Sequence, residues 1–222
     1  MMRVGIGIHH RQGRQSPDFL LTLQKAMDAA CLAFPQLEFD MVADAPDFAA
    51  LQAVLFDGSR QAVFLIADTG WLHFRCIREI LALYLDRGER VLIEAKAVPV
   101  ESPRRYDPQT LQTEWCSKDR LFVPQAVYEE LGPFDPGLEG LFDDVDYSWR
   151  ARSAGIATLI HPGAWFGCSP VMAELPEERQ EALRLGRQRL LDKWPGRKQD
   201  EPYWFAETRW DADSYWLAGL RW

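Results

Sequence analysis

The sequence predicts a single α/β domain in which a mostly parallel central sheet is flanked by helices. Apolar runs of four to six residues alternate with stretches of helical periodicity, which is typical of βαβ units. The chain has 222 residues, of which 47% are apolar, so it can bury one complete core but is short for two large domains.

The first two strands are predicted at residues 4–8 and 37–42, with a helix after each. In the first helix Ser16 is a candidate N-cap and Pro17 the first residue. Its apolar face is predicted to contain Leu20, Leu23, Met27 and Cys31. A short second helix is expected over residues 46–56.

The next strands are predicted at residues 62–66 and 91–94, and the helix between them ends at Gly88. Residues 95–113 contain three prolines and two adjacent arginines, and their length favours an irregular substrate loop. Regular secondary structure is predicted again at residues 121–123, and a helix follows over residues 124–131.

The composition changes near residue 170, so we expect a domain over residues 1–170 and a C-terminal extension over 171–222. The extension is predicted to contain a helix over about 176–194 and a tryptophan-rich tail, both packing on the domain. The apolar side of that helix would contain Leu183, Leu190, Leu191 and Trp194.

Charge and composition narrow the class of function. The net charge of −8 disfavours nucleic acid and anionic lipid as partners. The four cysteines show no metal-site spacing, which favours a reduced, cytoplasmic setting. A leader and a long apolar run are both missing from the sequence, so we expect no transmembrane segment.

The most informative stretch places Asp143, Asp144 and Asp146 at the predicted start of a helix. Acidic side chains are favoured in a first helical turn, so a purely structural cap remains one interpretation. The surrounding residues follow a longer pattern: Gly132, Phe134, Asp135, Asp143, Asp144, Val145, Asp146, Arg150, Ala154, Gly155 and Pro162.

This pattern resembles the family 2 glycosyltransferases of the GT-A fold, and within that family it is most similar to the bacterial, rhamnosyltransferase-like members. The resemblance is specific over residues 121–168 and fainter over the first 100. It implies that Asp144, and after it Asp143, is the general base that removes the proton of an acceptor hydroxyl. Asp146 and Arg150 either brace the site or act in it directly.

The resemblance also implies a nucleoside-diphosphate sugar as donor and Mg²⁺ or Mn²⁺ as cofactor, with Asp68 as the metal ligand. Two positions depart from the family pattern. Ile66 stands where the first aspartate of an Asp-x-Asp motif is expected, and Cys168 stands where a histidine is common.

Further donor-binding residues are expected at the carboxyl ends of strands, where ligands of open α/β sheets bind. The candidates there are His9 and Arg11 after the first strand. The resemblance also implies Asp44 after the second strand, at the position that reads the base or ribose, and Trp115 in the segment beneath the donor sugar. Lys118, which replaces a glycine of the family pattern, could contact a phosphate or be exposed, and exposure is favoured. Trp149, Trp165 and the tail tryptophans could stack on sugar faces or pack in the core.

We therefore expect an inverting, hexosyltransferase-type enzyme that moves a sugar from a nucleoside-diphosphate donor to a hydroxyl of a glycan or other acceptor, in bacterial surface polysaccharide synthesis. Two alternatives stay open. One is a catalytically degenerate GT-A-like domain that binds a nucleotide sugar or a protein partner. The other is a nucleotidyltransferase, which the missing glycine-rich basic loop after the first strand disfavours.

Overall fold

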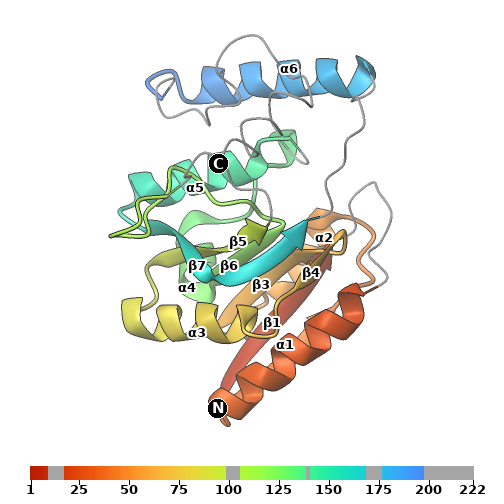
Figure 1. Ribbon diagram of the computed structural model, residues 1–222. Helices are drawn as coiled ribbons and strands as arrows, with labels where there is room; N and C mark the ends of the chain where they lie inside the picture. The colour runs from red at the N-terminus through yellow and green to blue at the C-terminus, as the bar shows by residue number, and fades with distance from the viewer. Residues whose placement is uncertain (10–17, 99–105, 139–140, 169–176, 198–222) are drawn as a thin grey trace.

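The computed structural model describes residues 1–9, 18–98, 106–138, 141–168 and 177–197. These residues form a seven-stranded sheet in the order β2-β1-β3-β6-β5-β7-β4, with helices on both faces (Figure 1). The strands are β1 (Met2–His9), β2 (Leu37–Val42), β3 (Ala62–Ala67), β4 (Gly70–Leu72), β5 (Val91–Val98), β6 (Arg120–Pro124) and β7 (Ala157–Cys168). The helices are α1 (Phe19–Ala33), α2 (Phe48–Leu55), α3 (Cys76–Arg87), α4 (Gln125–Leu131), the 3-10 helix η1 (Pro136–Leu138), α5 (Asp143–Ser153) and α6 (Glu177–Lys193).

The predicted α/β architecture is confirmed, and the sheet is mixed. Strand β1 pairs in parallel with β2 and β3, and β5 pairs in parallel with β7. Strand β6 runs antiparallel between β3 and β5, and β4 runs antiparallel to β7. The three-residue strand β4 was not predicted, because so short a segment shows no periodicity of its own.

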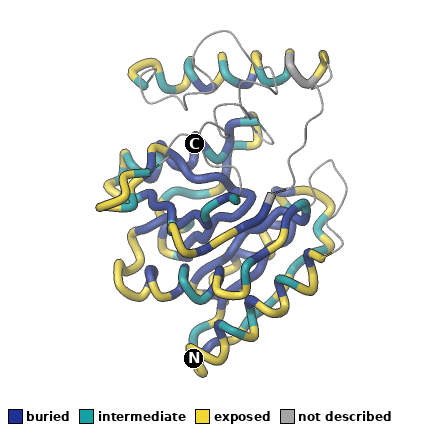
Figure 2. The backbone as a smooth tube through the Cα atoms, in the orientation of Figure 1, coloured by how far each residue is buried: buried dark blue, intermediate teal, exposed yellow. Residues whose placement is uncertain are grey.

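Alternate residues of each strand face opposite layers of helices. Along β3, Phe64 and Ile66 belong to the core that α1 and α3 cover, whereas Val63 and Leu65 belong to the core of α2, α4 and α5. Figure 2 shows the sheet as the buried centre of the molecule. Close packing extends to the backbone, because a Cβ on Gly7 would overlap the side chain of Leu55 in α2.

The predicted inner face of the first helix was partly wrong. Leu23 is buried as expected, but Leu20 and Cys31 are exposed. The buried positions of α1 are Phe19, Leu23, Ala26 and Ala30, which follow the 3.6-residue period of a helix more closely. Helix α1 begins after Asp18, which makes no side-chain cap; the proposed cap residues Ser16 and Pro17 lie outside the described residues.

Residues 95–113 are more regular than predicted. Strand β5 continues to Val98, and the described residues 106–113 form a turn that closes with a bridge between Tyr106 and Thr113. The turn is attached to β7, because the Thr113 N–H donates to the Thr158 carbonyl oxygen at 2.9 Å and the Thr158 hydroxyl donates to the Thr113 carbonyl oxygen.

The predicted C-terminal helix is present and docks on α5 and η1. Leu190 is fully buried against Phe142 and Trp149. The Trp194 indole N–H donates to Asp146 Oδ1 at 2.8 Å, and Lys193 Nζ lies 2.9 Å from the same oxygen. The tail at 198–222 lies outside the described residues, so its packing stays a prediction.

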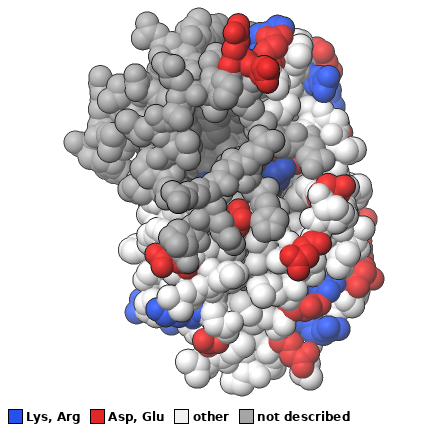
Figure 3. Space-filling model, turned by 90° about the vertical axis from the view of Figure 1, so that its right-hand side faces the viewer, with Lys and Arg blue, Asp and Glu red and all other residues white. Residues whose placement is uncertain are grey.

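Two further observations concern the surface. None of the helices in the described ranges has the length and apolar character needed to span a bilayer. On the face shown in Figure 3, acidic and basic side chains of the described residues are interspersed rather than gathered by sign.

Candidate functional site

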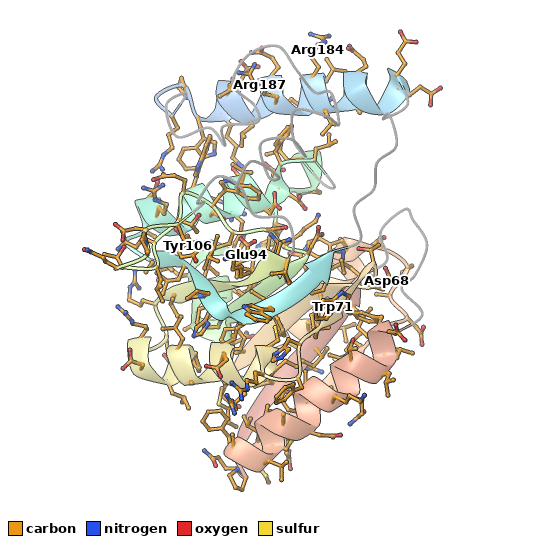
Figure 4. The ribbon with its side chains drawn as sticks, in the orientation of Figure 1. Asp68, Trp71, Glu94, Tyr106, Arg184 and Arg187 are labelled. Carbon is orange, nitrogen blue, oxygen red and sulfur yellow. The ribbon has the colours of Figure 1, made fainter. Side chains whose placement is uncertain are left out.

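The carboxyl ends of β1 and β3 bring His9 and Asp68 together. These strands are parallel neighbours in which His9 lies opposite Ala67, so Asp68 is the next residue along. The Asp68 N–H donates to the His9 carbonyl oxygen at 3.4 Å, and the Asp68 side chain is only 4% exposed. Figure 4 shows Asp68 at this end of the sheet. Two residues predicted from different segments are therefore neighbours.

Asp119 joins this pair, although sequence reasoning did not identify it. The Ala67 N–H donates to the Asp119 carbonyl oxygen at 2.8 Å, and Asp119 Oδ1 lies 3.7 Å from His9 Nε2. The His9 ring also contacts Phe48 edge to face, with ring centroids 5.7 Å apart. The antiparallel direction of β6 brings Asp119 here, and no motif in the sequence indicates that direction.

The start of α5 contributes a buried ion pair. The Asp143 carboxylate is 1% exposed and is paired with the Lys118 ammonium, which lies 4.4 Å from the centroid of the Phe48 ring. The expectation that Lys118 is exposed was wrong, because this carboxylate and this aromatic face hold its side chain inside. Burial raises the pKa of the Asp143 carboxyl group, and the Lys118 charge offsets part of that rise.

Asp144 has a different environment from its neighbour. Its side chain is half-buried, and its Oδ2 accepts the backbone N–H of Lys118 at 3.3 Å, while its Oδ1 accepts the N–H of Val145 at 2.9 Å. Adjacent helix residues point about 100° apart around the axis, so one carboxylate faces the core while the other faces the rim. The two acids are thereby distinguished by packing.

A second buried ion pair supports the segment that carries Lys118. Glu94 in β5 is fully buried, and its Oε1 lies 2.5 Å from Arg120 while its Oε2 accepts the Ser117 N–H at 2.8 Å. Figure 4 shows Glu94 nearer the middle of the sheet than Asp68. Glu94 thus fixes the backbone of Ser117, which directly precedes Lys118, the residue that contacts both Asp143 and Asp144.

A cavity of about 270 Å³ lies beside the ion pair of Asp143 and Lys118. Side chains of α2 and of the loop that follows α4 line it, and Asp143 reaches its wall. The lining includes Phe48, Gln52, Phe134 and Pro136 and is mostly apolar. Gln52 has a structural role, because its Oε1 accepts the Phe134 N–H at 2.9 Å and so joins α2 to the loop that follows α4.

The remaining predicted residues lie in varied places. Asp44 is exposed in the loop after β2, and Arg11 lies outside the described residues. Trp115 was expected beneath the donor sugar, but its indole is buried against Trp149 and Leu190 in the core between α5 and α6. The indole therefore belongs to this core, and a role for Trp115 in donor binding stays a prediction.

Asp146 and Arg150 brace the structure around the acids. Asp146 is fully buried, and its Oδ2 accepts from Arg150 Nε at 3.0 Å. Arg150 also donates to the carbonyl oxygens of Leu131 and Pro133, at 2.6 and 2.8 Å. These contacts join α5 to the loop that follows α4.

The described residues offer limited ligands for a divalent cation. No group of three or more His, Cys, Asp or Glu side chains with metal-binding geometry occurs among them. Ile66 is fully buried in the apolar core, so β3 supplies no acid before Asp68. These residues could hold a cation such as Mg²⁺ only together with a ligand. One or two carboxylates and the phosphates of that ligand would then share the coordination of the cation.

The sequence matches no protein-family profile and no curated protein. Solved structures show the same fold at low identity. GalNAc-T7, in a structure with UDP, GalNAc and Mn²⁺, aligns with a TM-score of 0.55 and 11% identity over 92% of this chain and 50% of its own. TarS from S. aureus aligns with a TM-score of 0.54 and 12% identity over 99% of this chain and 48% of its own. This chain thus spans about half the length of each.

A shorter TarS structure, residues 1–349 in complex with UDP-GlcNAc, aligns with a TM-score of 0.51 and 11% identity. The alignment covers 99% of this chain and 80% of that one. These likenesses, together with the curled sheet and the helices on both of its faces, establish that this chain has the GT-A glycosyltransferase fold.

Proposed function

We propose that this protein transfers a sugar from a nucleoside-diphosphate donor to a hydroxyl group of a glycan acceptor, with inversion at the anomeric carbon. The observation that carries the proposal is the pair of carboxylates at the start of α5. One is buried in an ion pair and the other is half-buried at the rim, on a fold shared with proteins whose structures contain UDP or UDP-GlcNAc.

Asp144 is the proposed general base. A base has to reach the acceptor hydroxyl, which favours the half-buried carboxylate over the one enclosed with Lys118. As the acceptor oxygen forms its bond to the anomeric carbon, Asp144 takes the hydroxyl proton, and the bond from that carbon to the diphosphate breaks. Asp143 is proposed to hold Lys118, whose backbone N–H in turn orients Asp144.

The donor diphosphate is proposed to lie at the carboxyl ends of β1 and β3, beside His9 and Asp68, with Asp44 toward the nucleotide. Arg11, outside the described residues, stays a candidate from the sequence. Asp68 is the residue that would hold Mg²⁺ or Mn²⁺ together with the phosphates. A bound cation stabilises the charge that develops on the leaving diphosphate. The role proposed for synthesis of a bacterial surface polysaccharide rests on the sequence resemblance.

A second candidate is a degenerate domain that binds a nucleotide sugar or a protein without catalysis. It is favoured by one observation, the burial of Ile66 in the core at the position where the family pattern has an acid. The two candidates differ in whether a bound donor is consumed.

Thermal unfolding with UDP, GDP, CDP and dTDP and their common sugars, each with and without Mn²⁺, tests donor binding. A ligand at about 100 times its Kd stabilises the folded state by about 2.7 kcal/mol, which is readily measured. We expect one nucleotide to raise the Tm of the wild type and to lose that effect in Asp68→Ala. If none of them shifts the Tm, both the transferase and the nucleotide-sugar-binding domain are excluded.

Donor hydrolysis and transfer then test catalysis. Asp144→Asn is expected to lower the rate by about 10²- to 10⁴-fold while donor binding persists, because the base is lost and the site is kept. Asp28→Asn, on the exposed side of α1, is the matched control and should leave the rate unchanged. A wild type that binds donor without consuming it supports the degenerate domain, and a product that retains the donor's anomeric configuration refutes inversion.

A further inference from the structure

The edge formed by β4 and β7 exposes a set of aromatic rings. Trp71 lies opposite Gly167 and Leu72 lies opposite Phe166 in the antiparallel register. Leu72 and Phe166 are buried in the core with α1, so Trp71 points to the other face of the sheet. His73 continues this edge, because its N–H donates to the Trp165 carbonyl oxygen at 3.1 Å.

The rings are held in fixed orientations. Trp71 lies directly against the backbone of Gly167, where a Cβ would overlap its indole, so only glycine permits this packing. The Trp165 indole N–H donates to the Pro162 carbonyl oxygen at 2.8 Å. The His73 ring lies 5.2 Å from Trp165 and 4.5 Å from Phe74, measured between centroids. We call Trp71, His73, Phe74 and Trp165 the aromatic platform.

The aromatic platform is exposed to an unusual degree. Trp71, Phe74 and Trp165 are 39%, 46% and 43% exposed, and they are the only aromatic residues among the exposed large hydrophobic side chains of the described chain. Gathered, oriented apolar groups of this kind on a surface mark a binding site more often than isolated ones do. The other exposed apolar residues of the described surface are aliphatic.

The place of the platform indicates its ligand. Trp71 follows Asp68 by three residues, so their Cα atoms are at most about 11 Å apart. Figure 4 shows the two side chains at the same end of the sheet. An acceptor bound next to a donor whose diphosphate lies beside Asp68 can therefore extend over Trp71.

A pyranose ring matches the chemistry of these side chains. Its C–H groups form an apolar face that packs on the negative face of an indole ring. Its hydroxyl groups require donors and acceptors at the rim, and His73 and the exposed Arg75 are such groups. Arg75 already lies over the Phe74 ring, 5.4 Å from its centroid.

We propose that Trp71, His73 and Trp165 bind a pyranose ring of the acceptor glycan. The assignment to the acceptor rests on the proposed function and on the strand order, because β4 and β7 form the sheet edge opposite β2 and β1, where the nucleotide is proposed to bind. In this arrangement the acceptor would approach the donor sugar from the β4–β7 edge of the sheet.

Isothermal titration with neutral oligosaccharides of rhamnose, glucose, galactose, N-acetylglucosamine and N-acetylgalactosamine tests the proposal directly. We expect at least one of them to bind the wild type and to bind Trp71→Ala about tenfold more weakly or worse, since a buried tryptophan contact contributes strongly to binding. Trp71→Phe, which keeps an aromatic face, should lose less. Leu85→Ala removes an exposed apolar side chain from α3, outside the platform, and should bind like the wild type.

Three outcomes overturn the proposal: no oligosaccharide binds the wild type, Trp71→Ala and Trp165→Ala both bind as tightly as the wild type, or Trp71→Ala converts a dimer into a monomer without changing glycan binding. If Trp71→Ala does not fold, Trp165→Ala and Trp71→Phe answer the same question. Nucleotide-induced Tm shifts, measured on the same variants, should be unchanged. Their absence in the wild type counts against the transferase, whereas loss of glycan binding alone counts against the platform.

Discussion

Replacing Lys118 with methionine tests how the two acids of α5 are distinguished. Methionine retains an unbranched side chain of similar length and removes the ammonium group that is paired with Asp143. Because the Asp143 carboxylate is only 1% exposed, it would become a buried charge without a counter-ion. Removing one partner of a buried ion pair costs about 3 to 5 kcal/mol, unless the remaining carboxylate takes up a proton.

The loss of stability should depend on pH in a defined direction. Burial already raises the pKa of Asp143, and without Lys118 only the backbone N–H groups of Asp143 and Asp144 offset that rise. A carboxyl group whose pKa is raised in the folded state contributes most to the free energy of unfolding below its unfolded pKa of about 3.9. This contribution is lost as the pH rises through the folded pKa. The slope reaches about 1.4 kcal/mol per pH unit, so the deficit of Lys118→Met should be larger at pH 8 than at pH 5.

Urea unfolding followed by tryptophan fluorescence at both pH values measures these differences. The double variant Lys118→Met/Asp143→Asn removes both charges and should recover much of the lost stability, because an apolar or neutral replacement of a whole buried pair is often tolerated. Two results refute the reasoning: a single variant within about 0.5 kcal/mol of the wild type at both pH values, or a double variant no more stable than the single one.

Three other predictions concern the framework of the site. Asp146→Ala should lower the free energy of unfolding by about 3 kcal/mol, because Arg150, Trp194 and Lys193 lose a buried acceptor. In the same urea assay, Asp192→Ala on the exposed side of α6 should change that free energy little. Glu94→Ala should cost about 3 to 5 kcal/mol by removing the carboxylate that neutralises the buried Arg120 guanidinium, and an unchanged urea midpoint would contradict this. The Lys193 hydrogen bond lowers the pKa of Asp135, so its stabilisation is present above pH 4 or so and is lost as pH falls further; Asp135→Asn should flatten that acid limb, and an identical pH profile of the Tm would argue against it.

Local features of the site were predictable from the sequence. The acids at 143 and 144 follow a helix that ends at Gly132, whose φ of 74° only glycine adopts readily, and they begin the next helix as expected. His9 was predicted because ligands of open α/β sheets bind at the carboxyl ends of strands, and Asp68 because it matches the second aspartate of the family's Asp-x-Asp pattern. Such signals depend on a few residues at fixed spacing.

The sites of Lys118, Asp119 and Trp115 could not be predicted in the same way. Lys118 was expected at the surface, and nothing in its neighbours in sequence indicates that Asp143, 25 residues away, and Phe48 enclose it. Asp119 reaches His9 only because β6 returns antiparallel to β3. Trp115 was expected beneath the donor sugar, and its burial in the cluster with Trp149 and Leu190 depends on the docking of α6, which its neighbours in sequence do not indicate.

The amino-acid sequence by itself determined most of the segments that become strands and helices, because hydrophobic periodicity, glycine stops and helix-start acids act over a few neighbouring residues. It also determined which residue types are available for chemistry. The tertiary structure alone decided which of two adjacent aspartates is buried with a lysine, and which aromatic rings remain exposed on the β4–β7 edge. The physical reason is that burial and pairing depend on strand direction and on contacts between residues far apart in the chain, and no local pattern encodes them.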